Sequence, residues 1–338
     1  MKKYLITGYA GFVSRHFLEY LDKNEAAACI KGLDTQNPPF PQEAYKSIRV
    51  NFEKVDLLDQ DRIEKIVCNF QPDYIVHLAS YSSVAFSWKE PILCFRNNMN
   101  IYLNLLEAVR KVNLPARILS IGSSEEYGNV GEKSLPLTER HVPGPLSPYA
   151  VARVSQEMIS KVYVDGYGLD IVMTRSFNHI GPNQKDIFVV SSFAKQLAEI
   201  KKNGSGSGEL VTGDTSIVRD FTDVRDAVAA YDLLLKKGKS GDIYNVCSGR
   251  GTSLKDVIEA MADILDLHIH TRVDENLVRP NDNKVIIGSS EKIKREVGWH
   301  NIIPLEKSLR DILDYWCTAR THFAGASGIG PAIEVVTR

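Results

Sequence analysis

The chain begins with short apolar runs that alternate with longer stretches in which apolar residues recur every three or four positions. The runs "KYLIT", "CIKGLD", "DYIVHLAS", "ARILSIGS" and "LDIVMTRS" are typical of buried strands. The stretches "FVSRHFLEYLDKN", "DQDRIEKIVCNF", "NMNIYLNLLEAVRKVN" and "SPYAVARVSQEMISKVYVDGYG" between them predict amphipathic helices. Because strands that alternate with helices form parallel βαβ units, this part predicts a doubly wound α/β domain.

The regular alternation ends after "FNHIGPNQ", where helices such as "SFAKQLAEIKK" and "LKDVIEAMADILD" are separated by loops and short strands. The run "NGSGSGE" at 203–209 predicts a flexible loop. We therefore divide the chain into a Rossmann-like domain at 1–176, to which segments near 211–248 return, and a smaller substrate-binding lobe mainly at 177–317. Residues 318–338 form a tail to which we assign no role.

Composition narrows the class of protein. The 338 residues are 43% hydrophobic and 25% charged, and the formal net charge is −1, which gives no sign of a nucleic-acid partner. No stretch reaches the roughly 20 apolar residues that a membrane helix needs. Five cysteines, with no CxxC pair among them, favour a reducing compartment and no metal site. We expect a cytoplasmic protein without a membrane partner.

The segment "ITGYAGFVS" predicts a phosphate-binding loop. It places Gly8 and Gly11 between a predicted strand and a predicted helix, where backbone amides can approach a pyrophosphate. Asp34 ends the next strand and can accept hydrogen bonds from ribose hydroxyls, although it could also be a turn residue. Its carboxylate would repel a 2′-phosphate, which favours NAD(H) and leaves NADP(H) possible. Asp56 and Leu57, at the end of a third strand, could face an adenine ring.

The segment "SPYAVAR" predicts proton chemistry. Tyr149 and Arg153 share one helix face, and a cation there stabilises an ionised tyrosine. Reduction of a ketone needs a proton delivered to its oxygen within about 3 Å. Tyr149 could donate that proton, and Ser123, at the end of a predicted strand, could hold the oxygen.

The strings "GYAGF", "HLAS", "IGSSEEYG", "SPYAVAR", "FNHIGPNQ" and "RDFTDVRD" occur in this order, and with them the chain resembles the extended short-chain dehydrogenases/reductases from about residue 1 to 316. "YNVCSG" and "RPND" add a resemblance to the branch that holds GDP-4-keto-6-deoxymannose reductases and GDP-mannose 4,6-dehydratases. The resemblance implies a homodimer formed through two helices of each subunit, with "NMNIYLNLLEAVRKVN" and the Tyr149 helix as the candidates.

The resemblance also implies roles for individual residues. Tyr149 matches the acid/base, Arg153 the usual lysine beside the cofactor, and Ser123 the hydroxyl that holds the reacting oxygen. The implied cofactor site adds Gly8, Gly11, Phe12, Val13, His77, Ala79, Asn98 and Phe177. The implied sugar-nucleotide site contains Ser83, Ser124, Glu125, Asn178, Arg219 and Arg279, in which the arginines suit a diphosphate.

Four functions stay open at this point. We favour NAD(H)-dependent reduction of the 4-keto group of a nucleotide-activated 6-deoxyhexose, with GDP as the nucleotide, because "IGSSEEYG" with Glu126 resembles the reductases. A 4,6-dehydratase needs a carboxylate two residues beyond the hydroxyl residue, and Glu125 stands there. An epimerase would suit the NAD preference of Asp34. A sugar-nucleotide binding protein with impaired catalysis is the fourth, because the larger, planar guanidinium of Arg153 replaces lysine.

Overall fold

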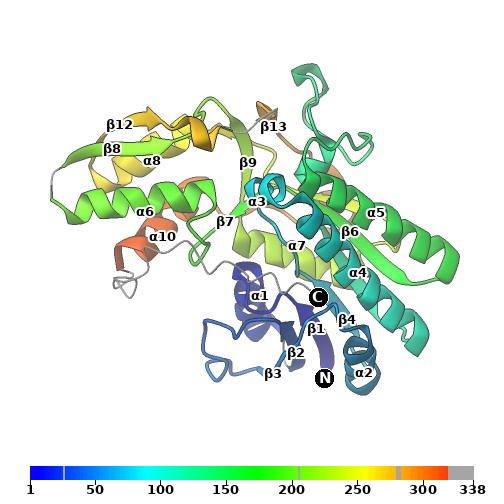
Figure 1. Cartoon of the computed structure of the whole chain (residues 1–338). Helices are drawn as coiled ribbons and strands as arrows, with labels where there is room; N and C mark the ends of the chain where they lie inside the picture. The colour runs from blue at the N-terminus through cyan, green and yellow to red at the C-terminus, as the bar shows by residue number, and fades with distance from the viewer. Residues whose placement is uncertain (26, 205, 279–282, 319–338) are drawn as a thin grey trace, which may run out of the picture.

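A parallel sheet of seven strands organises one lobe of the structure and is built from the N-terminal part of the chain and the returning strand β10 (Figure 1). The computed structural model describes residues 1–318 except 26, 205 and 279–282, and the strand count refers to these residues. The strand order is β10-β6-β5-β4-β1-β2-β3. The bounds are β1 Lys2–Thr7, β2 Ala28–Asp34, β3 Ile48–Lys54, β4 Tyr74–His77, β5 Arg117–Ser123, β6 Asp170–Ser176 and β10 Ile243–Val246. This order confirms the predicted doubly wound α/β fold.

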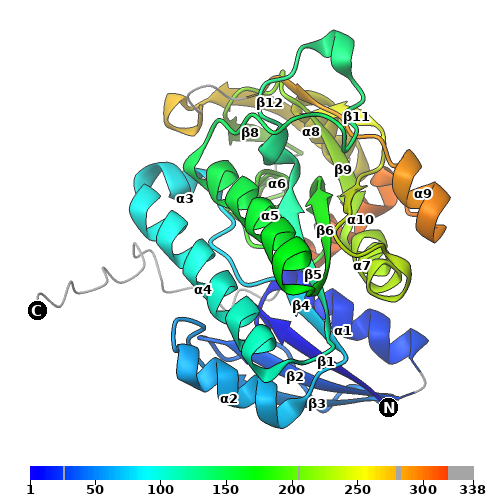
Figure 2. The ribbon, with the colours of Figure 1, turned by 90° about the vertical axis from the view of Figure 1, so that its right-hand side faces the viewer.

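Helices cover both faces of this sheet because its strands bury side chains on both sides (Figure 2). Along β1, Tyr4 and Ile6 pack into one hydrophobic core and Leu5 into the other, as the alternation of side chains in a strand requires. Helices α1 and α7 lie over the first core, and α2, α4 and α5 lie over the second. Their bounds are α1 Phe12–Asn24, α2 Gln60–Phe70, α4 Pro91–Val112, α5 Pro148–Tyr167 and α7 Val224–Lys237.

A second lobe lies beside the carboxyl ends of the strands (Figure 1). Its own core contains Phe193 of α6, Ile258 of α8 and Ile312 of α10. The strand β9 pairs with β7, β11 and β13, and β8 pairs with β12. The bounds are α6 Val189–Lys202, α8 Leu254–Leu265, α10 Leu305–Thr318, β7 Asn178–Ile180, β8 Ser207–Thr212, β9 Val218–Asp223, β11 Gly251–Ser253, β12 His268–Val273 and β13 Val285–Ile286.

The loop that we expected through 203–209 is shorter than predicted. Strand β8 begins at Ser207, because Ser207 to Thr212 pair with β12 from His268 to Val273. That pairing joins segments about 60 residues apart and overrides the weak strand preference of glycine and serine. The remaining short elements are α3 Val84–Lys89, α9 Glu291–Val297, η1 Ser124–Tyr127, η2 Glu132–Ser134 and η3 Glu275–Leu277.

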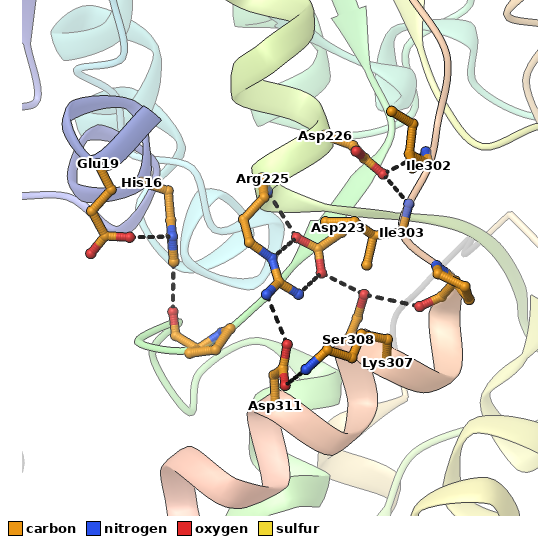
Figure 3. Close-up of polar contacts among 12 residues, drawn as sticks. His16, Glu19, Asp223, Arg225, Asp226, Ile302, Ile303, Lys307, Ser308 and Asp311 are labelled. Carbon is orange, nitrogen blue, oxygen red and sulfur yellow. Dashed lines mark hydrogen bonds and ion pairs between the residues drawn. The ribbon is translucent and has the colours of Figure 1, made fainter. Parts of the chain in front are cut away.

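A polar network joins the last described helix to the start of α7 (Figure 3). Asp223 ends β9 and caps α7 by accepting a hydrogen bond from the backbone N–H of Arg225 at 2.8 Å. Its carboxylate also accepts from the Arg225 guanidinium at 2.7 and 2.8 Å and from the Ser308 hydroxyl at 2.5 Å. Arg225 then reaches the carboxylate of Asp311 at 2.8 Å. The network therefore fixes α10 against the strand that leads back into the Rossmann-like domain.

Two further contacts hold the same region (Figure 3). Asp226 of α7 accepts hydrogen bonds from the backbone N–H groups of Ile302 and Ile303, in the segment that precedes α10. The Nε2 of His16, on α1, lies 3.0 Å from the carbonyl oxygen of Pro182, which follows β7.

Among the helices of the described residues, none has the length and hydrophobicity needed to cross a bilayer.

Candidate active site

The predicted phosphate loop lies where β1 ends and α1 begins. Gly8 has a φ of +70°, and a Cβ added there would lie 2.7 Å from the backbone nitrogen of Ala79. The residue at this position must therefore be glycine, both for its backbone conformation and for the close approach of the β4 end. Gly11 caps α1 without a side-chain hydrogen bond, so the amides of the first turn can serve a pyrophosphate.

Asp34 connects the end of β2 to this loop. Its carboxylate accepts hydrogen bonds from the backbone N–H groups of Ala10 and Gln36, each at 3.0 Å. Asp34 therefore has a turn-stabilising role beside its predicted role toward a ribose. Beyond β3, Asp56 is exposed and Leu57 is buried in the core, although we expected the two together beside an adenine ring.

The first turn of α1 reaches the second lobe. Phe12 and Val13 are half-buried and pack against the core under α1 and α7. The ring of Phe12 is stacked with His179, with 6.3 Å between the ring centroids and 13° between the planes. Asn178, the residue before His179, is exposed at the start of β7. The predicted cofactor loop and the predicted substrate residue Asn178 thus lie on adjoining segments.

His77 ends β4 as a buried, neutral side chain. Its Nδ1 lies 2.9 Å from the hydroxyl of Thr7, the last residue of β1. Burial and the positive charge of Arg153 lower the pKa of His77 to about 3. Ala79 lies just beyond, and its N–H donates to the Thr7 hydroxyl at 3.3 Å. This geometry gives His77 a packing role at the strand end.

Asn98 and Ser83 shape the segment that follows. The side chain of Asn98, buried in α4, accepts from the N–H of Tyr81 at 2.8 Å and donates to the carbonyl oxygen of Tyr81 at 3.2 Å. Ser83 caps α3 by accepting from the N–H of Phe86. Both side chains therefore hold the loop between β4 and α4, on the carboxyl edge of the sheet.

The end of β5 presents Ser123 at the same edge. Ser123 caps η1, and its hydroxyl accepts from the N–H of Glu125 at 3.2 Å. The carboxyl group of Glu126 accepts in return from the N–H of Ser123 at 2.6 Å, which completes a capping box. Ser124 is buried and Glu125 is half-buried in the same turn. The motif "GSSEEYG" thus holds Ser123 rigidly beside α5, against which η1 packs.

Glu126 is a buried carboxyl group next to Ser123. Burial and the nearby carboxylate of Glu157 raise its pKa well above the usual range. Arg175 makes two hydrogen bonds of 2.8 Å to Glu157, and its Nε is 3.8 Å from Glu126. In the sequence Glu126 served only as a point of resemblance to the reductases; in the structure it lies behind η1 and supports Ser123 from the core side.

Tyr149 and Arg153 meet on α5. Ser147 caps this helix, and its hydroxyl accepts from the N–H of Ala150 at 3.1 Å. The Nε of Arg153 donates to the phenol oxygen of Tyr149 at 3.2 Å. Both side chains are buried, at 7% and 5% exposure. The guanidinium therefore reaches the tyrosine hydroxyl directly, in a site from which water is largely excluded.

Gln156 was missing from the predicted site. It lies three residues after Arg153 on the same helix face, and its side-chain oxygen accepts from Arg153 Nη1 at 2.7 Å. Its side-chain nitrogen donates to the hydroxyl of Ser120 at 2.8 Å. The i,i+3 spacing was a usable signal, but the partner on β5 could not be read from the sequence.

The remaining substrate residues lie in or near the second lobe. Arg219 on β9 is buried, and its Nη1 donates to the carbonyl oxygens of Val218 and Asn283 at 3.0 and 2.7 Å. Phe177 is buried against Tyr127, with 6.2 Å between the ring centroids. Arg279 lies outside the described residues. No group of three or more His, Cys, Asp or Glu in the described part of the chain is arranged to hold a metal ion.

Comparisons with known proteins extend over nearly the whole chain. The model of the family described as GDP-mannose 4,6 dehydratase matches residues 5–312. A GDP-6-deoxy-D-mannose reductase of Pseudomonas aeruginosa is 32% identical over 315 residues, which cover 93% of this chain and 97% of that protein.

Solved structures agree with this match. The structure of RMD from Pseudomonas aeruginosa complexed with NADPH has a TM-score of 0.81 and 31% identity, over 94% of this chain and 99% of that one. A UDP-glucose 4-epimerase of Thermus thermophilus in complex with NAD has a TM-score of 0.81 and 28% identity, over 94% and 100%. These similar proteins therefore include a reductase and an epimerase, and their cofactors include both NADPH and NAD.

Proposed function

Since this chain belongs to the GDP-mannose 4,6 dehydratase family of extended short-chain dehydrogenases/reductases, we propose that it reduces the 4-keto group of a nucleotide-activated 6-deoxyhexose. GDP-4-keto-6-deoxy-D-mannose is the favoured substrate, and the product is a GDP-6-deoxy sugar. The observation that carries this proposal is the buried contact of 3.2 Å between Arg153 Nε and the Tyr149 hydroxyl. It brings the Tyr149 hydroxyl next to a fixed positive charge, which supports Tyr149 as the proton donor.

The chemistry follows from these residues. A nicotinamide cofactor, held by Gly8, Gly11 and Asp34, would supply a hydride to the carbonyl carbon. Tyr149 donates its hydroxyl proton to the carbonyl oxygen as negative charge develops there, and Ser123 holds that oxygen. Arg153 stabilises the tyrosinate that remains. Because a guanidinium does not give up its proton in proteins, Arg153 contributes charge and orientation, and Tyr149 regains its proton from elsewhere.

The preference for NAD(H) over NADP(H) is part of the proposal. Asp34 lies at the end of β2, with its carboxylate turned to the phosphate loop through Ala10. A 2′-phosphate placed beside this carboxylate would be repelled. We expect a larger kcat/KM with NADH than with NADPH, and we expect Asp34→Ser to narrow the difference.

A 4,6-dehydratase is the second candidate, because Glu125 follows Ser123 by two residues in the rigid turn of η1. Such an enzyme would take the hydride from C4, remove the C5 proton, expel the C6 hydroxyl as water and return the hydride to C6. It therefore consumes GDP-mannose without net oxidation of added NADH. This difference in stoichiometry separates the two functions.

The test is an absorbance assay of NADH or NADPH oxidation with GDP-4-keto-6-deoxy-D-mannose, run beside GDP-mannose alone. Tyr149→Phe should lower kcat by about 10²–10⁴-fold. The control is Tyr163→Phe on the same helix, where a tyrosine of equal exposure, 7%, donates to Glu107. It should keep kcat within about threefold. Conversion of GDP-mannose to a keto sugar with no net NADH consumption would replace the reductase by the dehydratase.

A homodimer through α4 and α5 is the assembly that we propose with this function. The two helices pack side by side (Figure 1). Their outer faces expose large apolar side chains, among them Ile92 at 71%, Met158 at 61% and Val162 at 55%. Such a patch is typical of a protein interface. The pair Met158→Glu and Val162→Glu should convert a dimer into a monomer in light scattering.

A further inference from the structure

We propose that Gln156 is a positioning residue, which fixes the guanidinium of Arg153 and through it the hydroxyl of Tyr149. This inference rests on the proposed function, in which Tyr149 is the proton donor. It explains how arginine can take the place beside Tyr149 that a lysine would fill. The arginine and the glutamine form a matched pair on one face of α5.

The hydrogen bonds of Arg153 define the geometry. Nη1 donates to Gln156 Oε1 at 2.7 Å and to the carbonyl oxygen of Ile121 at 2.9 Å, while Nε donates to Tyr149 Oη at 3.2 Å. Because the guanidinium is planar, two acceptors on Nη1 set the direction in which Nε points. Nη2 makes no hydrogen bond to any described residue, which leaves it for a cofactor hydroxyl.

Gln156 is itself fixed from the sheet. Its Nε2 donates to Ser120 Oγ at 2.8 Å and to the Ile121 carbonyl oxygen at 3.2 Å. Gln156 and Ser120 are each 2% exposed. A buried amide with all its polar atoms paired has one stable orientation, because turning it would place donor against donor. Strand β5 therefore determines where Gln156 presents its oxygen to Arg153.

Gln156 also affects the electrostatics of the site, because it is a neutral acceptor. The acceptors of Arg153 are an amide oxygen, a backbone carbonyl and a phenol, all of them neutral. A carboxylate in the place of Gln156 would hold the guanidinium equally well but would neutralise its charge. The neutral amide keeps that charge available to stabilise tyrosinate.

The titratable groups around Arg153 do not balance its positive charge. Its field acts on His77 of β4, Cys94 of α4 and Tyr231 of α7. Burial lowers the pKa of His77 and raises the pKa of Cys94, and both side chains are therefore neutral near pH 7. Burial also raises the pKa of Tyr231, to about 12. None of these groups supplies a negative charge.

Two substitutions and a matched control test the proposal. Gln156→Met removes the acceptor and keeps the length of the side chain, whereas Gln156→Glu keeps the acceptor and adds a negative charge. The control is Gln196→Met in α6, because the Gln196 side chain likewise makes three hydrogen bonds, to the N–H and the carbonyl oxygen of Val211 and to the hydroxyl of Ser192. The measurements are kcat, KM, the pH profile of kcat, NADH affinity by fluorescence and the melting temperature.

We expect Gln156→Met to lower kcat about tenfold with KM for the nucleotide sugar unchanged within about threefold, because the loss is in orientation at the reacting group. Gln156→Glu should lower kcat and change its pH profile, because the added carboxylate offsets the charge of Arg153 at the reacting group. Gln196→Met should change neither. A kcat and a pH profile unchanged in both Gln156 variants would overturn the proposal.

A double-variant cycle with Arg153→Lys makes the test independent of the substrate. If Gln156 acts through Arg153, NADH affinity in the double variant should be no weaker than in the weaker-binding single variant. Fully additive losses would overturn the positioning role, even in a protein that turns over no nucleotide sugar. Non-additive losses of NADH affinity in a protein that turns over no nucleotide sugar would support the pairing of Gln156 with Arg153. They would show that the proposed reaction, and not the positioning role, is wrong.

Discussion

Two arginines near the ends of parallel strands differ in their partners. Arg153 on α5 is 5% exposed, and its acceptors among the described residues are neutral oxygens of Tyr149, Ile121 and Gln156. Arg225 on α7 lies between two carboxylates, those of Asp223 and Asp311 (Figure 3). An arginine that is paired with carboxylates joins segments, whereas one that is held by neutral acceptors keeps a charge that can act on a third group.

Electrostatics supports this distinction. The hydrogen bond to Asp223 raises the pKa of Arg225 above its usual value. The positive charge of Arg225 is therefore balanced by the carboxylates of the network. The charge of Arg153 instead adds to burial in lowering the pKa of His77. We therefore expect changes at Arg153 to affect activity, and changes at Arg225 to affect stability.

The largest effect should come from Arg153→Met. This change removes the donor to Tyr149 and the positive charge while keeping most of the apolar volume. We expect kcat to fall about 10²–10³-fold, because preorganised charge at the reacting group is lost. Steady-state kinetics checks the effect, and circular dichroism checks that the fold is kept. A kcat within about threefold of the wild-type value would contradict a role of Arg153 in activity, and with it the distinction between Arg153 and Arg225.

The next effect should come from Arg225→Met, and it should be on stability. The side chain of Asp223 is fully buried and would keep only the Ser308 hydroxyl and a backbone N–H as donors. The side chain of Arg225 is 37% exposed, so solvent screens part of the loss. We expect the free energy of unfolding to fall by about 2–3 kcal/mol. Urea denaturation measures it. A tenfold loss of kcat in the folded variant would contradict a purely structural role.

A smaller effect should appear in the pH dependence of stability through His77. Its pKa is about 3 in the folded protein and about 6.5 when unfolded, so the unfolded state binds more protons between these values. The contribution of His77 to stability is therefore fully present above pH 6.5 and is lost as the pH falls below it. Between pH 7.5 and 5.0, His77 should account for about 2 kcal/mol of the loss.

Urea denaturation of the wild type and His77→Asn at the two pH values isolates this contribution, because other groups such as His179 are common to both proteins. An equal loss in both proteins would show that His77 does not titrate as described. In an Arg153→Met background burial remains the larger cause of the low pKa of His77, so the loss between pH 7.5 and 5.0 should be nearly the same.

The smallest effect should come from Lys307→Met. Lys307 pairs with Asp311 within α10, but its side chain is 58% exposed. An exposed pair of this kind contributes little, so we expect less than about 0.5 kcal/mol. The variant is the control for Arg225→Met, since both changes remove a partner of Asp311. A loss as large as that of Arg225→Met would show that Asp311, and not Asp223, governs the stability of the junction.

The sequence by itself determined the fold class and the family. Apolar residues at the strand and helix periods fixed the doubly wound sheet, because one face of each helix and both faces of each strand must leave water. Spacing also placed Tyr149 beside Arg153, since residues four apart share a helix face. Gly8 and Gly11 lie in the predicted turn between β1 and α1. The roles of these residues stay predictions.

Only the tertiary structure decided what surrounds them. Gln156 meets Ser120 and Ile121 because α5 packs across β5, and no local pattern reports that contact. Strand β8 forms from a glycine- and serine-rich run because β12 lies beside it. Asp223 and Ser308, 85 residues apart, meet only when α10 closes on the lobe. Periodicity records which side of an element is buried, whereas long-range packing adds the distant partners, here the carbonyl oxygen of Ile121 for Arg153 and the carboxylate of Asp311 for Arg225.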